Sequence, residues 1–167
     1  MTISNSLDIL IIKETWLIEE PDPSLCMLRQ LLPDFRLTSI PRAARGGLPA
    51  ILYRSFFTPK VNRGPVYSLF EYLDLNLSSG KFSCLFISFY QKESPFSQFI
   101  LDFSDLIECT IAIQIKIILA GDFNLHFDLP SDPHTVLFNE SLRTFDLQQH
   151  ITSPTHHSGH TLDFVII

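Results

Sequence analysis

The sequence predicts a mixed α/β fold in which strands and helices share one apolar core. Three observations indicate this class. Hydrophobic residues make up 46% of the 167 residues, charged residues only 18%, and fifteen residues are Phe. Short apolar runs that end in turn residues alternate with segments of helical spacing. The connections between them are short, which favours a sandwich of strands and helices over residues 1–167 as a single domain.

Six segments have the pattern of strands. They are residues 7–12, 50–57, 69–77, 82–90, 115–119 and 161–167. Residues 7–12 predict a short buried strand, and the branched apolar residues at 115–119 predict a strand that is buried on both faces. Residues 78–80 (Ser-Ser-Gly) predict a hairpin turn between two of the strands.

Three segments have the spacing of helices. They are residues 24–32, 96–107 and 134–145. The second has apolar residues recurring at three and four, which is typical of an amphipathic helix lying on a sheet. Ser94 and Pro95 precede it and predict a helix start with a hydroxyl N-cap and Pro at the first helical position.

The stretch from residue 115 to 128 contains the first candidate site. Its apolar strand stops at Gly121 and is followed at once by Asp122 and Asn124. Ligands gather at the carboxyl ends of strands in α/β sheets, so these side chains could form the rim of an active site. Gly, Asp and Asn are equally common in turns, and the stretch alone does not separate the two interpretations. Glu14 stands just beyond the first strand in the same setting.

Basic residues gather between residues 35 and 70, a segment without Asp or Glu. Six of the twelve Lys and Arg residues lie there, and residues 42–47 predict a flexible basic loop. The net charge of −6 argues against a general nucleic-acid binder. A local surface that faces a polyanion is the functional hypothesis for this segment, and a solvated basic face is the alternative. The residues of the hypothesis are Arg42, Arg45, Arg54, Lys60 and Arg63.

Other patterns in the sequence bear on the cellular compartment of the chain and on membrane association. Cys26, Cys84 and Cys109 are odd in number and widely spaced, which favours buried thiols in a reducing compartment. No apolar run approaches the roughly 20 residues that span a bilayer. The first residues lack the basic segment and cleavage site of a secretory signal, so we expect an intracellular location, in the nucleus or the cytoplasm.

Histidines cluster near the end of the chain. His156, His157 and His160 invite a zinc interpretation, but their spacing matches no helical zinc motif, and no Cys or Glu lies nearby in sequence. A solvent-exposed loop is therefore the favoured interpretation. His126 lies two residues after Asn124. It either lines the cleft of the candidate site or is a packing residue without a functional role.

Several motifs occur in an order that resembles a known superfamily. ETWL begins at Glu14, GDFN at Gly121 and TLDFVI at Thr161. Together they resemble the endonuclease/exonuclease/phosphatase superfamily, the DNase I-like proteins. The longer segments AILYR, FEYLDLNLSSGK, GDFNLHFD and SPTHHSGHTLDFVI resemble more narrowly the apurinic-type endonuclease domain of non-LTR, LINE-like retrotransposons.

The resemblance implies a two-sheet β-sandwich flanked by helices in four layers, and metal-dependent hydrolysis of DNA phosphodiesters. Glu14 would hold Mg²⁺ or Mn²⁺, and Asp122 would orient or deprotonate the attacking water. Asn124 would donate a hydrogen bond to the phosphate, Tyr90 would help to hold it, and Asp163 would orient a catalytic His. The alternatives are a solvated Glu14, a packing Tyr90 and an Asp163 at an outward-facing strand position.

The family pattern also contains an Asn-bearing first strand and a final Ser-Asp-His, and this sequence shows neither. We therefore expect an endonuclease domain that is truncated at both ends and impaired. Its partner would be DNA, with no membrane and no obligate protein partner. A silent nucleic-acid-binding remnant is the alternative, and a phosphatase of the same fold is less favoured.

Overall fold

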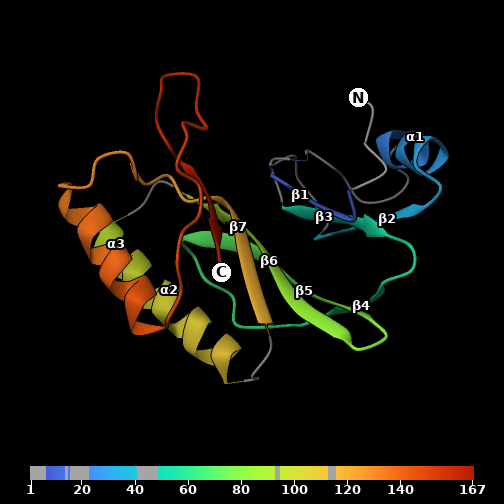
Figure 1. Cartoon of the computed structure of the whole chain (residues 1–167), viewed down its shortest axis with the longest axis horizontal. Helices are drawn as coiled ribbons and strands as arrows, with labels where there is room; N and C mark the ends of the chain where they lie inside the picture. The colour runs from blue at the N-terminus through green and yellow to red at the C-terminus, as the bar shows by residue number, and fades with distance from the viewer. Residues whose placement is uncertain (1–6, 14, 16–22, 41–48, 93–94, 113–115) are drawn as a thin grey trace.

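The computed structural model describes residues 7–13, 15, 23–40, 49–92, 95–112 and 116–167 (Figure 1). These residues form eight strands and three helices. The strands are β1 (Ile9–Ile12), β2 (Phe35–Ser39), β3 (Ala50–Arg54), β4 (Thr58–Val61), β5 (Phe70–Ser79), β6 (Phe82–Gln91), β7 (Lys116–Asp122) and β8 (Asp163–Ile166). The helices are α1 (Pro23–Leu31), α2 (Phe96–Ile111) and α3 (Pro133–Thr144).

The strands form two sheets. One has three strands in the order β1-β3-β2, and the other has five in the order β4-β5-β6-β7-β8. All neighbouring strands are antiparallel except β6 and β7, which are parallel and are joined through α2. Figure 1 shows α2 and α3 on one side of the five-stranded sheet, and the three-stranded sheet with α1 on the other. This arrangement confirms the predicted two-sheet α/β sandwich.

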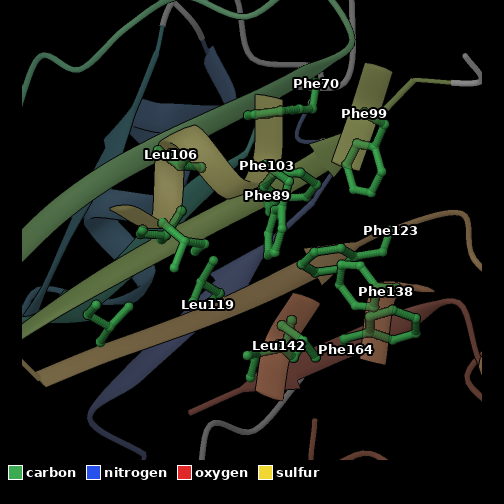
Figure 2. Close-up of a cluster of buried hydrophobic side chains, with 14 of the residues drawn as sticks. Phe70, Phe89, Phe99, Phe103, Leu106, Leu119, Phe123, Phe138, Leu142 and Phe164 are labelled. Atoms are coloured by element: carbon green, nitrogen blue, oxygen red, sulfur yellow. The ribbon is translucent and has the colours of Figure 1, made fainter. Parts of the chain in front are cut away.

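The larger core lies between the five-stranded sheet and the two long helices (Figure 2). Its centre is a group of fully buried aromatic rings. Phe89 stacks on Phe123 with ring centroids 4.5 Å apart, and Phe123 stacks on Phe164 at 4.8 Å. Rings from two helices, from three strands and from the residue that follows β7 meet there, which explains the high Phe content. The rings are Phe70, Phe89, Phe99, Phe103, Phe123, Phe138 and Phe164.

A second, smaller core joins the two sheets. Leu75 and Phe86 of the large sheet pack with Ile51 of β3, while Ile11 and Ile118 lie against this cluster. Strand β7 thus contributes to both cores, because Leu119 faces the helices. The prediction of a strand buried on both faces is confirmed for β7. Strand β1, predicted to be buried, is only half-buried, since it is an outer strand of the described three-stranded sheet.

The sequence pattern missed two strands and set some boundaries wrongly. Strands β2 and β4 were missed because they are short, with five and four residues, and each lies at the edge of its described sheet. Strand β3 ends at Arg54 instead of residue 57, because Ser55 and Phe56 form a turn. The predicted hairpin between β5 and β6 is confirmed, and Gly80 supplies its left-handed conformation with φ 58°.

The three predicted helices are confirmed. Asp132 caps α3, where its Oδ2 accepts a hydrogen bond from the Thr135 backbone N–H at 3.0 Å. Pro95 occupies the N-cap position of α2 instead of the predicted first helical position, and Ser94 lies outside the described residues. No helix in the described part of the chain is long and apolar enough to cross a membrane.

The prediction of buried thiols is wrong for two of the three cysteines. Cys84 is buried between the sheets, whereas Cys26 on α1 and Cys109 on α2 are exposed. Both exposed thiols lie on helices, where one face remains open to solvent, and widely spaced cysteines carry no signal for which face they occupy.

Candidate functional site

Four polar residues form one row across the large sheet. Tyr90 of β6 is in register with Asp122 of β7, and Asp122 is in register with Asp163 of β8. Glu71 of β5 extends the row beyond Tyr90. Register partners on neighbouring strands point to the same face of a sheet. Side chains at every second position of a strand point to the same face, so Asp122 shares its face with Ala120 and Ile118. Ile118 packs against the core between the two sheets, and the row therefore faces the space between them.

The row forms because β7 continues further than its apolar run predicts. The strand was expected to stop at Gly121, but it runs to Asp122. A Cβ atom at Gly121 would lie 1.8 Å from the Phe89 carbonyl oxygen, so only Gly permits this close pairing of β6 and β7. Asp122 is consequently the last paired residue of the strand and is 8% exposed.

Asn124 closes the turn that follows β7. Its backbone has a φ of 49°, a conformation that Asn tolerates better than most residues. Its backbone N–H donates to Asp122 Oδ1 at 3.0 Å, and its side-chain Nδ2 donates to the Gln91 carbonyl oxygen at 2.7 Å. The stretch was interpreted either as a turn or as the rim of a site. The structure shows a turn, and that turn orients the carboxylate of Asp122.

Lys13 lies between the two carboxylates of the row. It follows β1, and its Nζ lies 3.2 Å from Asp122 Oδ2 and 2.5 Å from Asp163 Oδ1. Burial lowers the pKa of the Lys13 ammonium, but the hydrogen bonds and charges of Asp163 and Asp122 raise it by more, and the net pKa lies above 10.5. The ammonium is thus charged at neutral pH and offsets the repulsion between the two carboxylates.

Sequence reasoning missed Lys13 and Glu71. Lys13 directly precedes Glu14 at the end of an apolar strand, and that position was the available signal. Glu71 is an acidic residue within a strand of the core, and its side chain is 14% exposed and lies 2.9 Å from Lys92 Nζ. Glu14 itself, the predicted metal ligand, lies outside the described residues.

A second polar cluster lies beside the first. His126 and Asp128 follow β7, and His160 precedes β8. Asp128 Oδ2 lies 2.9 Å from His160 Nδ1, and Asp128 Oδ1 accepts the Thr161 backbone N–H at 2.9 Å. The hydrogen bond from His160 and then that from Thr161 lower the pKa of Asp128 to about 2. His160 thus lies against His126, a grouping that the sequence pattern did not indicate.

The predicted basic surface is only partly described. Arg42 and Arg45 lie outside the described residues, while Lys60 on β4 and Arg63 after it are exposed. Arg54 lies over the Phe35 ring at 4.5 Å, and its Nε donates to the Leu7 carbonyl oxygen at 3.3 Å. These contacts hold Arg54 near the start of β1, at the end opposite Lys13, so Arg54 is not part of the acidic row.

Comparison with solved structures identifies the fold. The chain is similar to the 3′ phosphatase NExo from Neisseria bound to a product DNA hairpin, with 15% identity over 98% of this chain and 77% of that one, at a TM-score of 0.68. It is similar to the AP endonuclease LMAP from Leishmania major, with 14% identity over 95% of this chain and 69% of that one, at a TM-score of 0.64.

A retrotransposon protein shares the same architecture. The endonuclease domain of TRAS1, a telomere-specific non-LTR retrotransposon, is 11% identical over 80% of this chain, with a TM-score of 0.61. The chain spans 64% of the length of that domain. No protein-family model and no curated protein matches the sequence. The chain therefore has the DNase I-like fold of endonucleases, exonucleases and phosphatases.

Proposed function

We propose that this chain is a metal-dependent phosphodiester hydrolase that cleaves DNA, of the type found in non-LTR retrotransposons. The observation that carries the proposal is the register row of Tyr90, Asp122 and Asp163, with Asn124 hydrogen-bonded to Asp122. These are the four residues to which the motifs assign catalytic roles, and they come from three strands and one turn. The similarity to the TRAS1 endonuclease domain, named above, supports the retrotransposon type.

Each side chain has a chemical task in this proposal. Asp122 is held by Asn124 and is positioned to orient a water molecule and accept its proton. The amide of Asn124 is uncharged, so it can donate to a phosphate oxygen without repelling it. Tyr90, next to Asp122 in the row, offers a phenolic O–H to the same phosphate. Asp163 completes the anionic end of the row.

The donor chemistry of the row suits a hard divalent cation. Mg²⁺ prefers oxygen ligands and retains several waters, so one or two carboxylates are enough to hold it. Glu14 would hold the ion, and Asp163 is a further oxygen donor in the row. When bound, such an ion neutralises the charge that builds up on a phosphoryl group.

Lys13 supports a second candidate function. Its ammonium contacts both carboxylates and offsets their mutual repulsion without any added cation. A divalent ion would have to compete with a tethered charge that lies 2.5 Å from Asp163. Low activity is therefore expected, and a silent module that only binds nucleic acid is the alternative. A phosphatase of the same fold is the less favoured candidate, and the similarity to the 3′ phosphatase NExo supports it.

The test measures nicking of supercoiled plasmid with Mg²⁺, with EDTA as the blank. We expect slow nicking by the unaltered chain and a loss of about 10²–10⁴-fold in Asp122→Asn, because that carboxylate is the proposed base. Lys13→Met should bind Mg²⁺ more tightly, measured by calorimetry, because the competing ammonium is gone. Asp34→Asn, at an exposed position outside the row, is the matched control.

The two candidate functions give different results. Nicking that EDTA abolishes and that Asp122→Asn removes, while Asp34→Asn retains it, supports the hydrolase. If neither the unaltered chain nor Lys13→Met nicks DNA, the hydrolase proposal fails. If the chain then still binds DNA, and this binding weakens as the salt concentration rises, the result supports the alternative of a module that only binds nucleic acid.

A further inference from the structure

His126, Asp128 and His160 bring three potential metal ligands together outside the acidic row. One ligand atom from each residue can be chosen so that all three lie within 4.8 Å of one another. His126 and Asp128 come from the segment after β7, and His160 comes from the segment before β8. The three ligands are therefore contributed by two loops that meet only in the folded chain.

The backbone holds both loops in place independently of the three side chains. The Phe127 N–H donates to the Thr161 carbonyl oxygen at 3.2 Å, which joins the two loops directly. The hydroxyl of Thr135 on α3 donates to the His126 carbonyl oxygen at 3.1 Å. The His156 N–H donates to the His160 carbonyl oxygen at 2.9 Å. A ligand that binds here thus meets loops that are already ordered, which lowers the entropic cost of binding.

The distances are close to those of a tetrahedral site. Zinc–ligand bonds of about 2.0–2.2 Å place neighbouring ligand atoms about 3.3 Å apart in a tetrahedron. His160 Nδ1 and Asp128 Oδ2, now 2.9 Å apart through a shared hydrogen bond, would separate by only a few tenths of an ångström. The His126 ring lies edge-on to His160 with centroids 4.3 Å apart, so a rotation of an exposed side chain brings its nitrogen into range.

We propose that His126, Asp128 and His160 form a zinc site with a fourth position open to solvent. Two imidazole nitrogens and one carboxylate suit zinc, whereas Mg²⁺ prefers oxygen ligands. The site therefore selects a different class of metal from the acidic row and shares no residue with it. Bound zinc links the loop after Asp122 to the loop before Asp163, and so clamps the rim of the acidic row. The site does not depend on hydrolase activity.

The test uses the full chain without a polyhistidine tag, titrated with ZnCl₂ in a calorimeter. We expect binding of one zinc per chain, a rise in melting temperature with zinc, and no displacement by millimolar Mg²⁺. Co²⁺ in place of zinc should give the visible absorption bands of a tetrahedral nitrogen and oxygen site. His126→Ala and His160→Ala should each weaken zinc binding by at least about 100-fold, since even outer-shell partners of metal ligands cost about 10–100-fold.

His157→Ala is the matched control, because His157 lies on the same exposed loop as His160 but outside the cluster. It should bind zinc as the unaltered chain does. The proposal is overturned if the unaltered chain binds no stoichiometric zinc, or if His126→Ala binds it equally well. Loss of zinc binding in His157→Ala would likewise overturn it, because the metal would then sit on the His156–His157 segment instead. Circular dichroism without metal confirms that each variant is folded.

Discussion

Gly121 is the residue on which the close pairing of β6 and β7 depends. It lies opposite Phe89 in the parallel ladder, and the Phe89 carbonyl oxygen occupies the space that a Cβ atom would need. This steric restriction bears on the proposed site, because the next residue is Asp122. A side chain at position 121 would push β7 away from β6 and would move that carboxylate out of the row.

We expect Gly121→Ala to destabilise the fold by roughly 3 kcal/mol or more, since the clash is with backbone and cannot be relieved by a rotamer change. The measurement is urea unfolding. Gly80→Ala is the comparison, because Gly80 also has a positive φ but has nothing within 4 Å of the added methyl. That variant should lose only about 1–2 kcal/mol. Equal losses in the two variants would show that the close approach to Phe89 contributes nothing.

Helix α3 is held to the sheet by one aromatic residue in particular. Phe138 is fully buried and lies within 6.3 Å, centroid to centroid, of rings from α2 and from two strand ends. The Pro, His and Thr residues at the start of the helix contribute little apolar surface, so the sheet-facing stripe depends on few positions. Figure 2 shows Phe138 directed into the aromatic cluster beside Phe123 and Phe164.

Truncation of that ring should be costly. Phe138→Ala is expected to destabilise the fold by about 3–5 kcal/mol, because the cavity it leaves is surrounded by rigid rings. The neighbouring Leu137 is 51% exposed, so Leu137→Ala should change stability by no more than about 0.5 kcal/mol. Thermal and urea unfolding of both variants measure the difference, and a small effect for Phe138→Ala would mean that α3 docks by other contacts.

Strand β5 carries a buried carboxyl group at Asp74. Burial raises its pKa above the ordinary 3.8, and the hydrogen bond from Asn62 lowers it only in part. The folded chain therefore holds this proton more tightly than the unfolded chain, so stability from this group falls as the pH rises through and above 3.8. An ionised Asp74 is thus a net cost at neutral pH.

Asp74→Asn removes that cost and keeps an oxygen that accepts the Asn62 hydrogen bond of 2.8 Å. We expect the variant to be more stable than the unaltered chain at pH 7, with the difference shrinking as the pH falls toward 4. Melting temperatures measured from pH 4 to pH 7 test this pH dependence. The exposed Asp34→Asn controls for the loss of one negative charge. A variant that is less stable at pH 7 would contradict the assignment.

At the scale of the whole molecule, the acidic row and the exposed basic residues lie in different regions. The described acidic row faces the space between the sheets, where Lys13 from the small sheet joins Asp122 and Asp163 of the large one. The exposed cations Lys60 and Arg63 belong to a different region, at β4 and the segment after it. With a net charge of −6, the proposed contact with DNA would depend on such local basic surfaces and not on the overall field.

If Lys60 and Arg63 contact phosphates, Lys60→Ala and Arg63→Ala should each weaken DNA binding on all sequences. Each should also reduce the slope of log affinity against log salt by about 1, which fluorescence anisotropy at several salt concentrations measures. Arg54→Ala is the contrast, because Arg54 packs on Phe35 and should affect stability more than the salt slope. If the salt slope were unchanged in all three variants, Lys60 and Arg63 would not contact DNA phosphates.

Local pattern was sufficient for much of the fold. The helices at α1, α2 and α3 and the strands β5, β6, β7 and β8 all followed from periodicity and turn residues, because these signals lie within a few residues. The outer strands β2 and β4 were not predicted, because their patterns of five and four residues are too short to distinguish a strand from a loop. The order of the motifs in the sequence also indicated the DNase I-like fold.

Within the site, the sequence by itself identified the candidate residues Tyr90, Asp122, Asn124 and Asp163. Only the tertiary structure decided that three of them share one row, because strand register is set by pairing between segments far apart in the chain. It alone placed Lys13 between Asp122 and Asp163, more than 100 positions away. It also grouped His160 with His126 and Asp128. The loop after β7 and the loop before β8 lie together because these two strands are paired.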